Sequence, residues 1–554
     1  MKRIISLLLV FIQIILLVSC SAPSPEEKPK TEGDTPTTDD APTTEDGVNE
    51  ELPHVCEFNV ETIGSKTVKT RATCTKQAEY YYSCACGEIG EESFFFGDLA
   101  GHDFYVKSVL EKYLVKEATV KTSAVYYKSC KCGATGESTF EYGTPLQLSE
   151  EQKAHLPTSL TVTLYDTVGG VYGFTYNSSA MPIVPVIQIK KIGDAEWTEY
   201  VPTSYEATTV NKNDVEVPYY ISKAEIALAS DTEYVYRVCD KGVDVATPEN
   251  TLKTKNASAE AFTFAHVSDS QAGTAEFGWV MKAVSDNVDF VVHTGDVVQY
   301  AHKEQEWTDM LDGNYEYVAG MPIMAITGNH ETSYNNATYE IDKHFNNQMP
   351  EQSSTALGYY YSFVYGNVKF IMLNTNDLEA NRLKAEQYDW LIGELESNTC
   401  KWTIVAMHNP MYSVGKYGAD ETRNAIALAL RDQLGGVFIE YGVDLVLEAH
   451  DHAISRTFPI GGDGVANAET TENVDGVEYL VDPDGVVYVM NGPAGTQQRA
   501  PVAVDESLYA YAEVSKPASW AEITVDGDTL TVTVKWHTGT GEHVYHTWGI
   551  KKSR

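Results

Sequence analysis

Five short hydrophobic runs in the second half of the chain each end at residues that can bind metal ions. Runs of this length, rich in β-branched residues, are typical of buried strands. The runs and the residues that follow them are Phe262–Val267 before Asp269, Ser270 and Gln271; Val288–Val292 before Gly295 and Asp296; Pro322–Ile326 before Gly328, Asn329, His330 and Glu331; Trp402–Met407 before His408; and Val443–Leu447 before Ala449, His450, Asp451 and His452. In an open α/β sheet, sites lie just beyond the carboxyl ends of the strands. The pattern therefore predicts that these side chains meet at one sheet edge.

The side chains at these strand ends combine hard oxygen donors with imidazole nitrogens. The candidate ligands are Asp269, Asp296, Asn329, His408, His450 and His452. This mixture suits divalent or trivalent metal ions. We therefore expect two ions that share one aspartate, as in two-metal hydrolytic sites.

The composition limits the kinds of partner. The chain has 554 residues, enough for several domains, and carries 40 basic against 79 acidic residues, for a net charge of −39. Binding to nucleic acid regardless of sequence needs a basic surface that neutralises phosphates. No nucleic-acid partner is therefore expected.

The first 20 residues have the pattern of a sorting segment. Lys2 and Arg3 precede an apolar run, Ile4–Val18, that is short for a membrane span. The end of the segment, Leu17-Val18-Ser19-Cys20, resembles the bacterial lipobox, which implies a lipidated Cys20 and an anchor at the outer face of a bacterial membrane. An ordinary signal peptide or an uncleaved anchor is the alternative. Residues 21–51 are rich in Ser, Pro, Thr, Asp and Glu, which predicts a disordered tether.

Two copies of one small unit follow, at residues 52–98 and 99–144. The sequence Ser-Cys-x-Cys-Gly recurs, with its cysteines at Cys84 and Cys86 and then at Cys130 and Cys132. A histidine opens each copy, at His54 and His102, and the first copy adds Cys56 and Cys74. Units this small usually need cross-links or metal. Disulfides and a zinc site both remain open, and the repeats are candidates for contact with a cell-surface partner.

Residues 155–257 alternate between apolar and polar side chains with frequent turn residues, which predicts a β-sandwich. From 260 to 552, strands alternate with helical patterns. Helices are expected over Thr274–Asp286, Arg382–Ser397 and Arg423–Tyr441, and a hairpin over Trp520–Trp536 with its turn at Asp526-Gly527. Cys239 and Cys400 each stand alone, and we expect both to be buried and inert.

The ordered set of Asp269, Asp296, Asn329-His330, His408 and His450-x-His452 resembles the calcineurin-like metallophosphoesterase superfamily. The sandwich ahead of it makes the purple acid phosphatase-like branch the best match. The resemblance implies an α/β metallophosphatase sandwich, with two β-sheets flanked by helices, preceded by a fibronectin-III-like domain. It also implies that Asp296 bridges two ions, with Asp269 and His452 on the first and Asn329, His408 and His450 on the second.

The resemblance implies hydrolysis of phosphate monoesters, as by an acid phosphatase, through metal-bound hydroxide. The ions would be Fe, Mn, Zn or Mg. His330 would neutralise charge or protonate the leaving oxygen, and Glu331 would orient His330. The alternatives are a phosphodiesterase with the same ions and a surface adhesion protein without catalysis.

Three positions depart from the family pattern. Gln299 stands where purple enzymes carry an iron-binding tyrosine, and the neighbouring Tyr300 would point to the other strand face, so a purple site is not expected. Gln271 stands where many relatives have a histidine ligand, and we include it as a candidate ligand, with a hydrogen bond to a water as the alternative. Ala449 replaces a glycine.

Residues beyond His408 are candidates for the mouth of the site, with ordinary loop residues as the alternative: Asn409, Tyr412, Lys416, Tyr417 and Arg423. Other histidines are expected to be structural: His266, His293, His302 and His344.

Overall fold

The structure is a computed structural model that describes residues 55–119, 122–256, 258–332, 340–350, 359–415, 424–502 and 505–553. The predicted leader with Cys20, the tether and His54 lie outside these residues. The chain divides into two compact units, with the boundary after Asp103. In the part described, every helix is too short or too polar to cross a membrane.

The first unit holds a small antiparallel sheet in the order β1-β2-β3, and the second unit opens with a sheet of the same design, β4-β5-β6. Their strands are β1 Val68–Thr70, β2 Ala78–Ser83, β3 Ile89–Phe96, β4 Leu114–Lys116, β5 Ala124–Ser129 and β6 Thr135–Tyr142. In both sheets a valine bridges the last residue of the middle strand, Val60 to Ser83 and Val106 to Ser129. The two sequence copies therefore fold alike.

An all-β sandwich follows, as the alternating pattern predicts. One sheet has the order β10-β9-β13-β14, with β15 also on β13, and the other has the order β11-β12-β8-β7. The strands are β7 Thr158–Asp166, β8 Val171–Ser178, β9 Pro185–Lys191, β10 Thr198–Tyr200, β11 Thr203–Val210, β12 Glu216–Ala227, β13 Glu233–Asp240, β14 Val245–Ala246 and β15 Asn250–Lys253. The sheets meet through Phe174 and Tyr236, whose ring centroids lie 5.4 Å apart. A short helix, α1 Glu150–His155, precedes them.

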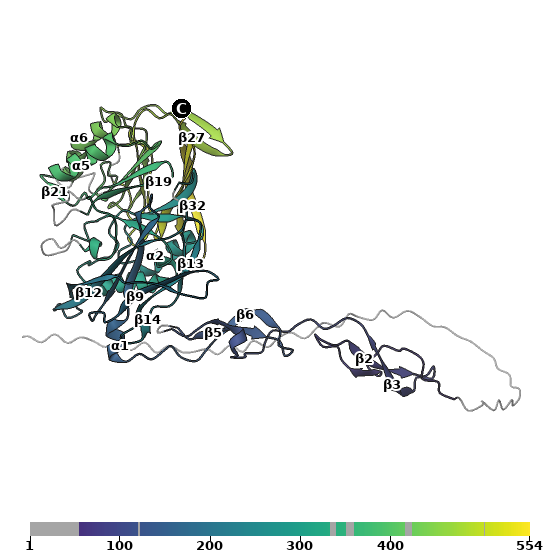
Figure 1. Ribbon diagram of the computed structural model, residues 1–554. Coiled ribbons are helices and arrows are strands. Elements are labelled where there is room, and N and C mark those ends of the chain that lie inside the picture. Colours follow the sequence, from purple (N-terminus) through teal and green to yellow (C-terminus); the bar gives the residue numbers. More distant parts are fainter. Residues whose placement is uncertain are drawn as a thin grey trace, which may run out of the picture. The chain divides into compact units, whose positions relative to one another are not determined.

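The remaining chain builds two larger sheets (Figure 1). The eight-stranded sheet has the order β18-β17-β16-β30-β31-β32-β27-β26, and the seven-stranded sheet has the order β19-β20-β23-β24-β28-β25-β29. The first comprises β16 Ala261–Val267, β17 Phe290–His293, β18 Ile323–Ala325, β26 Thr471–Val474, β27 Val477–Val481, β30 Ser519–Asp526, β31 Thr529–His537 and β32 Glu542–Lys551. The second comprises β19 Tyr361–Tyr365, β20 Val368–Met372, β23 Trp402–Ala406, β24 Leu445–Glu448, β25 Ile454–Thr457, β28 Val487–Asn491 and β29 Tyr509–Glu513.

Aromatic side chains join the inner faces of these two sheets. The ring of Phe370 on β20 lies 5.1 Å from that of Phe264 on β16 and 5.5 Å from that of Phe290 on β17. Helices cover the outer faces: α2 Thr274–Val284 packs against β30 and β31, and α5 Ala385–Glu396 and α6 Ala425–Glu440 bury leucines against the seven-stranded sheet. Helices α3 Glu304–Leu311 and α4 Tyr315–Val318 connect β17 to β18.

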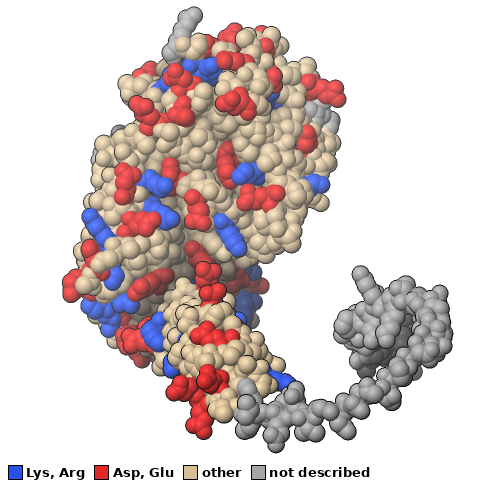
Figure 2. Space-filling view, turned by 90° about the vertical axis from the view of Figure 1, so that its right-hand side faces the viewer, with Lys and Arg blue, Asp and Glu red and all other residues tan. Residues whose placement is uncertain are grey.

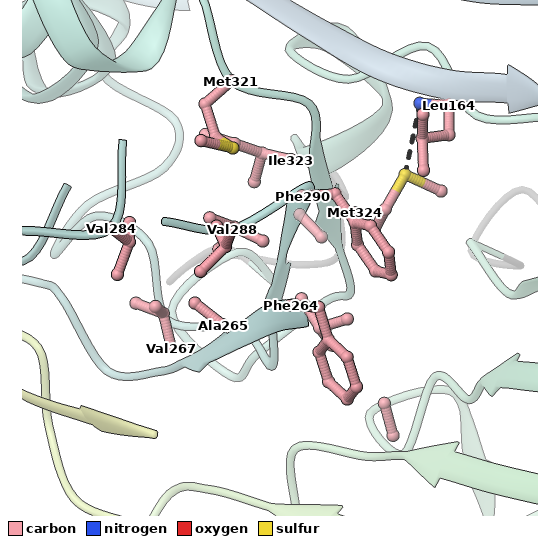
Figure 3. Close-up of a cluster of buried hydrophobic side chains, with 14 of the residues drawn as sticks. Leu164, Phe264, Ala265, Val267, Val284, Val288, Phe290, Met321, Ile323 and Met324 are labelled. Atoms are coloured by element: carbon pink, nitrogen blue, oxygen red, sulfur yellow. Dashed lines mark hydrogen bonds between the residues drawn. The ribbon is translucent and has the colours of Figure 1, made fainter. Parts of the chain in front are cut away.

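The sandwich and the larger sheets share one hydrophobic core. Leu164 of β7 reaches Met324 of β18, with the Leu164 N–H 3.3 Å from the Met324 sulfur (Figure 3). Val162 bridges Pro322, and the Tyr236 hydroxyl donates a hydrogen bond to the Ala319 carbonyl, 2.5 Å away. The sandwich is therefore built into the α/β part rather than linked to it loosely.

The predicted elements are confirmed with small changes of boundary. The three helices expected from 274, 382 and 423 are α2, α5 and α6, although Arg382 and Leu383 belong to a short strand, β22 Arg382–Leu383, paired with β21 Leu378–Glu379. The expectation of a single sheet edge is wrong. Strands β16, β17 and β18 lie in one sheet and β23 and β24 in the other, because the apolar runs carry no information about which strands pair.

Acidic and basic side chains are interspersed on the face seen in Figure 2. The sequence as a whole carries more acidic than basic residues, 79 against 40.

Candidate metal centre

The site forms where the carboxyl ends of strands from both large sheets face each other. Asp269 follows β16, Asp296 follows β17 and Asn329 follows β18, all in the eight-stranded sheet. His408 follows β23, and His450 and His452 follow β24, in the seven-stranded sheet. Parallel pairing of β16 with β17, of β17 with β18, and of β23 with β24 points each set of loops in one direction.

Several of these residues have a backbone conformation that side chains rarely adopt. Their φ angles lie in the left-handed region, at 50° for Asp269, 57° for Asp296, 70° for His450 and 52° for His452. Such residues cost free energy, of the order of 1–3 kcal/mol each, and cluster at functional sites. The backbone changes direction abruptly at these residues, and their side chains face one another as a result.

The ligand atoms form two groups that share Asp296. One group joins Asp269, Asp296 and His452, and the other joins Asp296, His408 and His450; within each group the donor atoms lie within 4.8 Å of one another. Asn329 extends the second group, with its Oδ1 3.1 Å from His408 Nε2. All six predicted residues therefore come together, although they are spread over nearly 200 positions.

Hydrogen bonds on the far side of two rings fix which nitrogen faces the site. His408 Nδ1 lies 2.8 Å from the Thr294 carbonyl, and His452 Nδ1 lies 2.6 Å from the Gln497 carbonyl. Each Nδ1 therefore donates, so Nε2 is the nitrogen that each ring presents to a metal ion. His450 instead turns Nδ1 inward, 3.2 Å from His408 Nε2, and its backbone N–H donates to the Asp269 carboxylate.

Gln271 lies within the first group. Its Nε2 is 3.3 Å from both Asp296 Oδ2 and His452 Nε2, and within the described part of the chain its buried Oε1 has no hydrogen-bond partner. Rotation of the amide group by 180° exchanges its oxygen and nitrogen atoms. With the amide turned over, the oxygen would face a cation between Asp296 and His452, so this residue fits a metal ligand.

The charge of Asp296 suits a bridging role. Burial raises the pKa of this carboxyl group, but His408 and the neighbouring imidazoles outweigh burial and hold the pKa well below its usual value. Asp296 is therefore ionised. A buried carboxylate surrounded by imidazole nitrogens is a donor set that a cation can occupy in place of the imidazole protons, so the residues present fit the metal ions that the resemblance implies.

His330 lies beside the two groups without belonging to either. Its Nε2 is 3.8 Å from Asp296 Oδ2, and its side chain is 25% exposed. Its Nδ1 lies 2.8 Å from the Gln299 carbonyl oxygen, to which it donates. Gln299, at the position of the purple tyrosine, thus holds the histidine, while Tyr300 is exposed and lies under Lys303.

Glu331 has a different contact from the one predicted. Its buried carboxylate accepts hydrogen bonds from the backbone N–H groups of Asp296, Val297 and Gly328, at 2.7–2.8 Å. The prediction that Glu331 orients His330 is therefore corrected: Glu331 ties the loop after β17 to the loop after β18, and Gln299 orients the ring. Adjacency in sequence suggested the wrong pair, because side chains of consecutive residues diverge.

A sixth strand end contributes residues that the sequence analysis missed. Strand β28 runs parallel to β24, and the loop beyond it brings Gln497 to His452 and Gly495 against the first loop. A Cβ on Gly495 would lie 2.8–2.9 Å from the carbonyl oxygens of Gln271, Asp269 and Ser270. The apolar run before Asn491-Gly492-Pro493 was a visible signal for this strand.

Two residues predicted for the mouth are buried instead. Tyr412 packs on Tyr488 under Arg431, and Asn409 bonds Thr375 and Asn376. Lys416, Tyr417 and Arg423 lie outside the described residues.

The four histidines that were expected to be structural each contact neighbouring side chains, in agreement with that expectation. The ring nitrogens of His266 lie within hydrogen-bond distance of Thr294 and Asn491, and His293 contacts the Ser270 hydroxyl. The ring of His344 stacks on Trp307 and contacts the Glu304 carboxylate. The ring of the part-buried His302 contacts Tyr300. Burial lowers the pKa of both His266 and His293 to about 3. Cys239 is buried as expected, whereas Cys400 is only partly buried.

The comparisons agree with this geometry. Residues 262–453 match the model of the calcineurin-like phosphoesterase family. An uncharacterised protein of Mycobacterium tuberculosis is 28% identical over 383 residues, covering 60% of this chain and 70% of that protein. Acid phosphatase type 7 of Homo sapiens is 30% identical over 201 residues, covering 34% of this chain and 43% of that protein. A purple acid phosphatase from yellow lupin (Lupinus luteus) seeds superposes with a TM-score of 0.61 at 15% identity, over 78% of this chain and 80% of that one.

The fold and site together define a metallophosphoesterase. Residues 262–453 form a calcineurin-like phosphoesterase domain. The chain is a phosphoesterase that resembles purple acid phosphatases.

Proposed function

We propose that the protein hydrolyses phosphate monoesters with two metal ions. Asp269, Gln271, Asp296 and His452 would hold one ion, and Asp296, Asn329, His408 and His450 the other. The sharing of Asp296 between two groups of ligand atoms carries this proposal. Bound Fe, Mn, Zn or Mg ions would neutralise phosphate oxygens and lower the pKa of coordinated water, which supplies the nucleophile.

His330 would assist departure of the alcohol. Its Nδ1–H is held by the Gln299 carbonyl, so a second proton on Nε2 can be donated toward the substrate's leaving oxygen. Partial exposure of the ring lets substrate reach it. In this proposal the histidines and carboxylates of the site would bind the ions or backbone groups, so attack by a protein side chain would not be required.

The proposed location is the outer face of a bacterial membrane, with the chain held by acyl groups on Cys20 and separated from the bilayer by residues 21–51. Lys2, Arg3, the apolar run and the lipobox-like Leu17–Cys20 segment support this location. The phosphate ester is then an extracytoplasmic substrate. The exposed Phe95 and Phe96 of the first repeat and Tyr142 of the second support contact with a surface partner.

The substrate class is tested with chromogenic esters. The full chain, freed of metal by a chelator, would receive Mn²⁺, Fe²⁺, Zn²⁺ or Mg²⁺ and then p-nitrophenyl phosphate or bis-p-nitrophenyl phosphate. Faster turnover of the monoester is expected. Hydrolysis of the diester alone would identify a phosphodiesterase, and hydrolysis of neither ester with any metal would favour the adhesion protein.

The bridging role of Asp296 is tested by Asp296→Asn. This change removes the shared negative charge, so kcat/KM should fall at least about 100-fold, the upper range for loss of a metal-supporting contact. Metal content, measured by elemental analysis, should fall with it. Full activity with two ions retained would reject the assignment.

A further inference from the structure

Three thiols meet at the end of the first small sheet, in the part of the chain that precedes the phosphoesterase. The Sγ atoms of Cys56, Cys84 and Cys86 all lie within 4.8 Å of one another, and those of Cys56 and Cys86 are 3.4 Å apart. None of these residues belongs to the site described above. Cys84 is buried, Cys56 is half-buried and Cys86 is exposed.

The local backbone explains why the thiols converge. A tight turn follows β2, in which the Gly87 N–H donates to the Cys84 carbonyl and Gly87 has a φ of +94°. This turn places Cys84 and Cys86 on one side. Two backbone hydrogen bonds join Val60 to Ser83, and they hold the segment that carries Cys56 beside Cys84 and Cys86.

The spacing fits ligands around one ion. Tetrahedral zinc has Zn–S distances of about 2.3 Å, which separates two thiolates by about 3.8 Å. A disulfide needs its sulfurs about 2.05 Å apart, so Cys56 and Cys86 are near enough to share an ion but are not bonded. A disulfide within the cluster would also leave one thiol over, whereas a soft thiolate-binding ion can take all three.

The sheet has little else to hold it together. Among the described residues up to Asp103, the buried side chains are Thr67, Ala78, Ser83, Cys84 and Phe94. A unit of this size cannot bury enough apolar area to offset chain entropy and usually depends on cross-links or metal. Metal binding would supply the missing free energy of folding.

We propose that Cys56, Cys84 and Cys86 bind one structural zinc-class ion, separate from the phosphoesterase centre. Each thiol would release its proton to solvent as the thiolate binds the ion. The fourth ligand is left open, because His54, two positions before Cys56, lies outside the described residues.

Peptide-resolved alkylation of the native full chain tests this site. With Zn²⁺ bound, Cys56 and Cys86 should react with iodoacetamide at least about tenfold more slowly than after treatment with a strong chelator. Added Zn²⁺ should restore the protection. Cys400, a partly buried thiol elsewhere, should react equally in all three states. If a reductant but not a chelator removed the protection of Cys56 and Cys86 from alkylation, the thiols would form a disulfide. Rapid alkylation of both thiols in all three states would exclude both a disulfide and a bound ion. Either result would overturn the proposal.

Matched serine variants locate the ion. Cys86→Ser alters an exposed side chain and should cost little packing, yet it should remove the chelator-sensitive protection of Cys56. Cys400→Ser should leave that protection unchanged. Asp296→Asn should also leave it unchanged, even when the phosphoesterase centre loses its ions, so failure of one site is distinguishable from failure of the other. Protection of Cys56 that survives Cys86→Ser would contradict a shared ion.

Discussion

At the scale of single residues, the His330 ring has one nitrogen held by a hydrogen bond and the other facing the site. Its Nδ1 is bound to the Gln299 carbonyl, while Nε2 lies near Asp296 at the exposed edge of the site. We expect His330→Ala to lower kcat by about 10²–10⁴-fold, the usual value of a general acid, with metal content unchanged.

The matched control for His330→Ala is His543→Ala, which removes an exposed ring on β32. Steady-state kinetics with p-nitrophenyl phosphate, beside elemental analysis, would separate the two effects. Loss of metal in His330→Ala, or equal activity in both variants, would show that His330 does not act as a proton donor.

Single residues of the site can be recognised in the sequence where the chemistry requires one type of side chain. Asp296 and His408 were recognisable because few side chains bind metal. Gln497 was not, because it contributes a backbone carbonyl to His452, and any residue can offer one. The partner of Glu331 was also inaccessible, since a carboxylate that accepts backbone N–H groups leaves no pattern in the sequence.

At the scale of elements, the close approach of two loops fixes the position of Asp296. A Cβ on Gly328 would lie 2.2 Å from the Asp296 backbone nitrogen and 2.2 Å from its Oδ1. We expect Gly328→Ala to destabilise the protein by about 1–3 kcal/mol through overpacking and to reduce metal binding. Denaturant unfolding and elemental analysis would measure these effects.

Gly393→Ala provides the control for that substitution. Gly393 lies in α5, and an added Cβ meets nothing within 4 Å among the described residues. Alanine should therefore stabilise the helix by about 0.5–1 kcal/mol, with activity unchanged. If both alanine variants behaved alike, the contact between the loops after β17 and β18 would not be critical.

A buried carboxylate links the loop after β23 to the end of β24. Glu448 accepts hydrogen bonds from the backbone N–H groups of Met411 and Tyr412, and burial raises its pKa from the usual 4.5 to about 8. The folded state therefore favours the protonated form. This contribution to stability is complete below pH 4.5 and is lost as the pH rises toward 8, by several kcal/mol at most.

Glu448→Gln keeps an acceptor oxygen for these N–H groups and removes the titration. We expect the thermal midpoint of the variant to change less than that of the parent between pH 5 and pH 8, at equal metal occupancy. Identical pH profiles for the two proteins would show that Glu448 does not titrate in this range.

Periodicity predicted the type of these elements well. The runs before Asp269, Asp296, Asn329, His408 and His450 are strands, and the expected helices are α2, α5 and α6. The division of these strands between two sheets was not predictable. Strand pairing depends on contacts between distant segments, and it produces no periodic pattern in the local sequence.

At the scale of the whole molecule, the sandwich and the phosphoesterase sheets share a single core. Phe174 of β8 is fully buried and contacts Tyr236, whose hydroxyl donates to Ala319 at the start of the loop into β18. We expect Phe174→Ala to cost about 3–5 kcal/mol and to lower the melting temperature of both parts together.

Scanning calorimetry, with activity measured after each temperature step, would follow this change. One cooperative transition should contain the sandwich and the phosphoesterase domain, and loss of activity should coincide with it. Should Phe174→Ala shift only part of the heat absorption and leave the thermal loss of activity in place, the two parts would unfold independently.

The sequence by itself determined the candidate metal ligands, the strands that precede them and the repeated units, because each depends on residue type and local spacing. Only the tertiary structure decided that two sheets supply the centre, that Gln299 holds His330, that Glu331 fastens two loops, and that Cys56 joins Cys84 and Cys86. These features depend on which distant segments pack together. Burial of apolar surface drives that packing, and it is nondirectional, so a linear pattern does not encode its outcome.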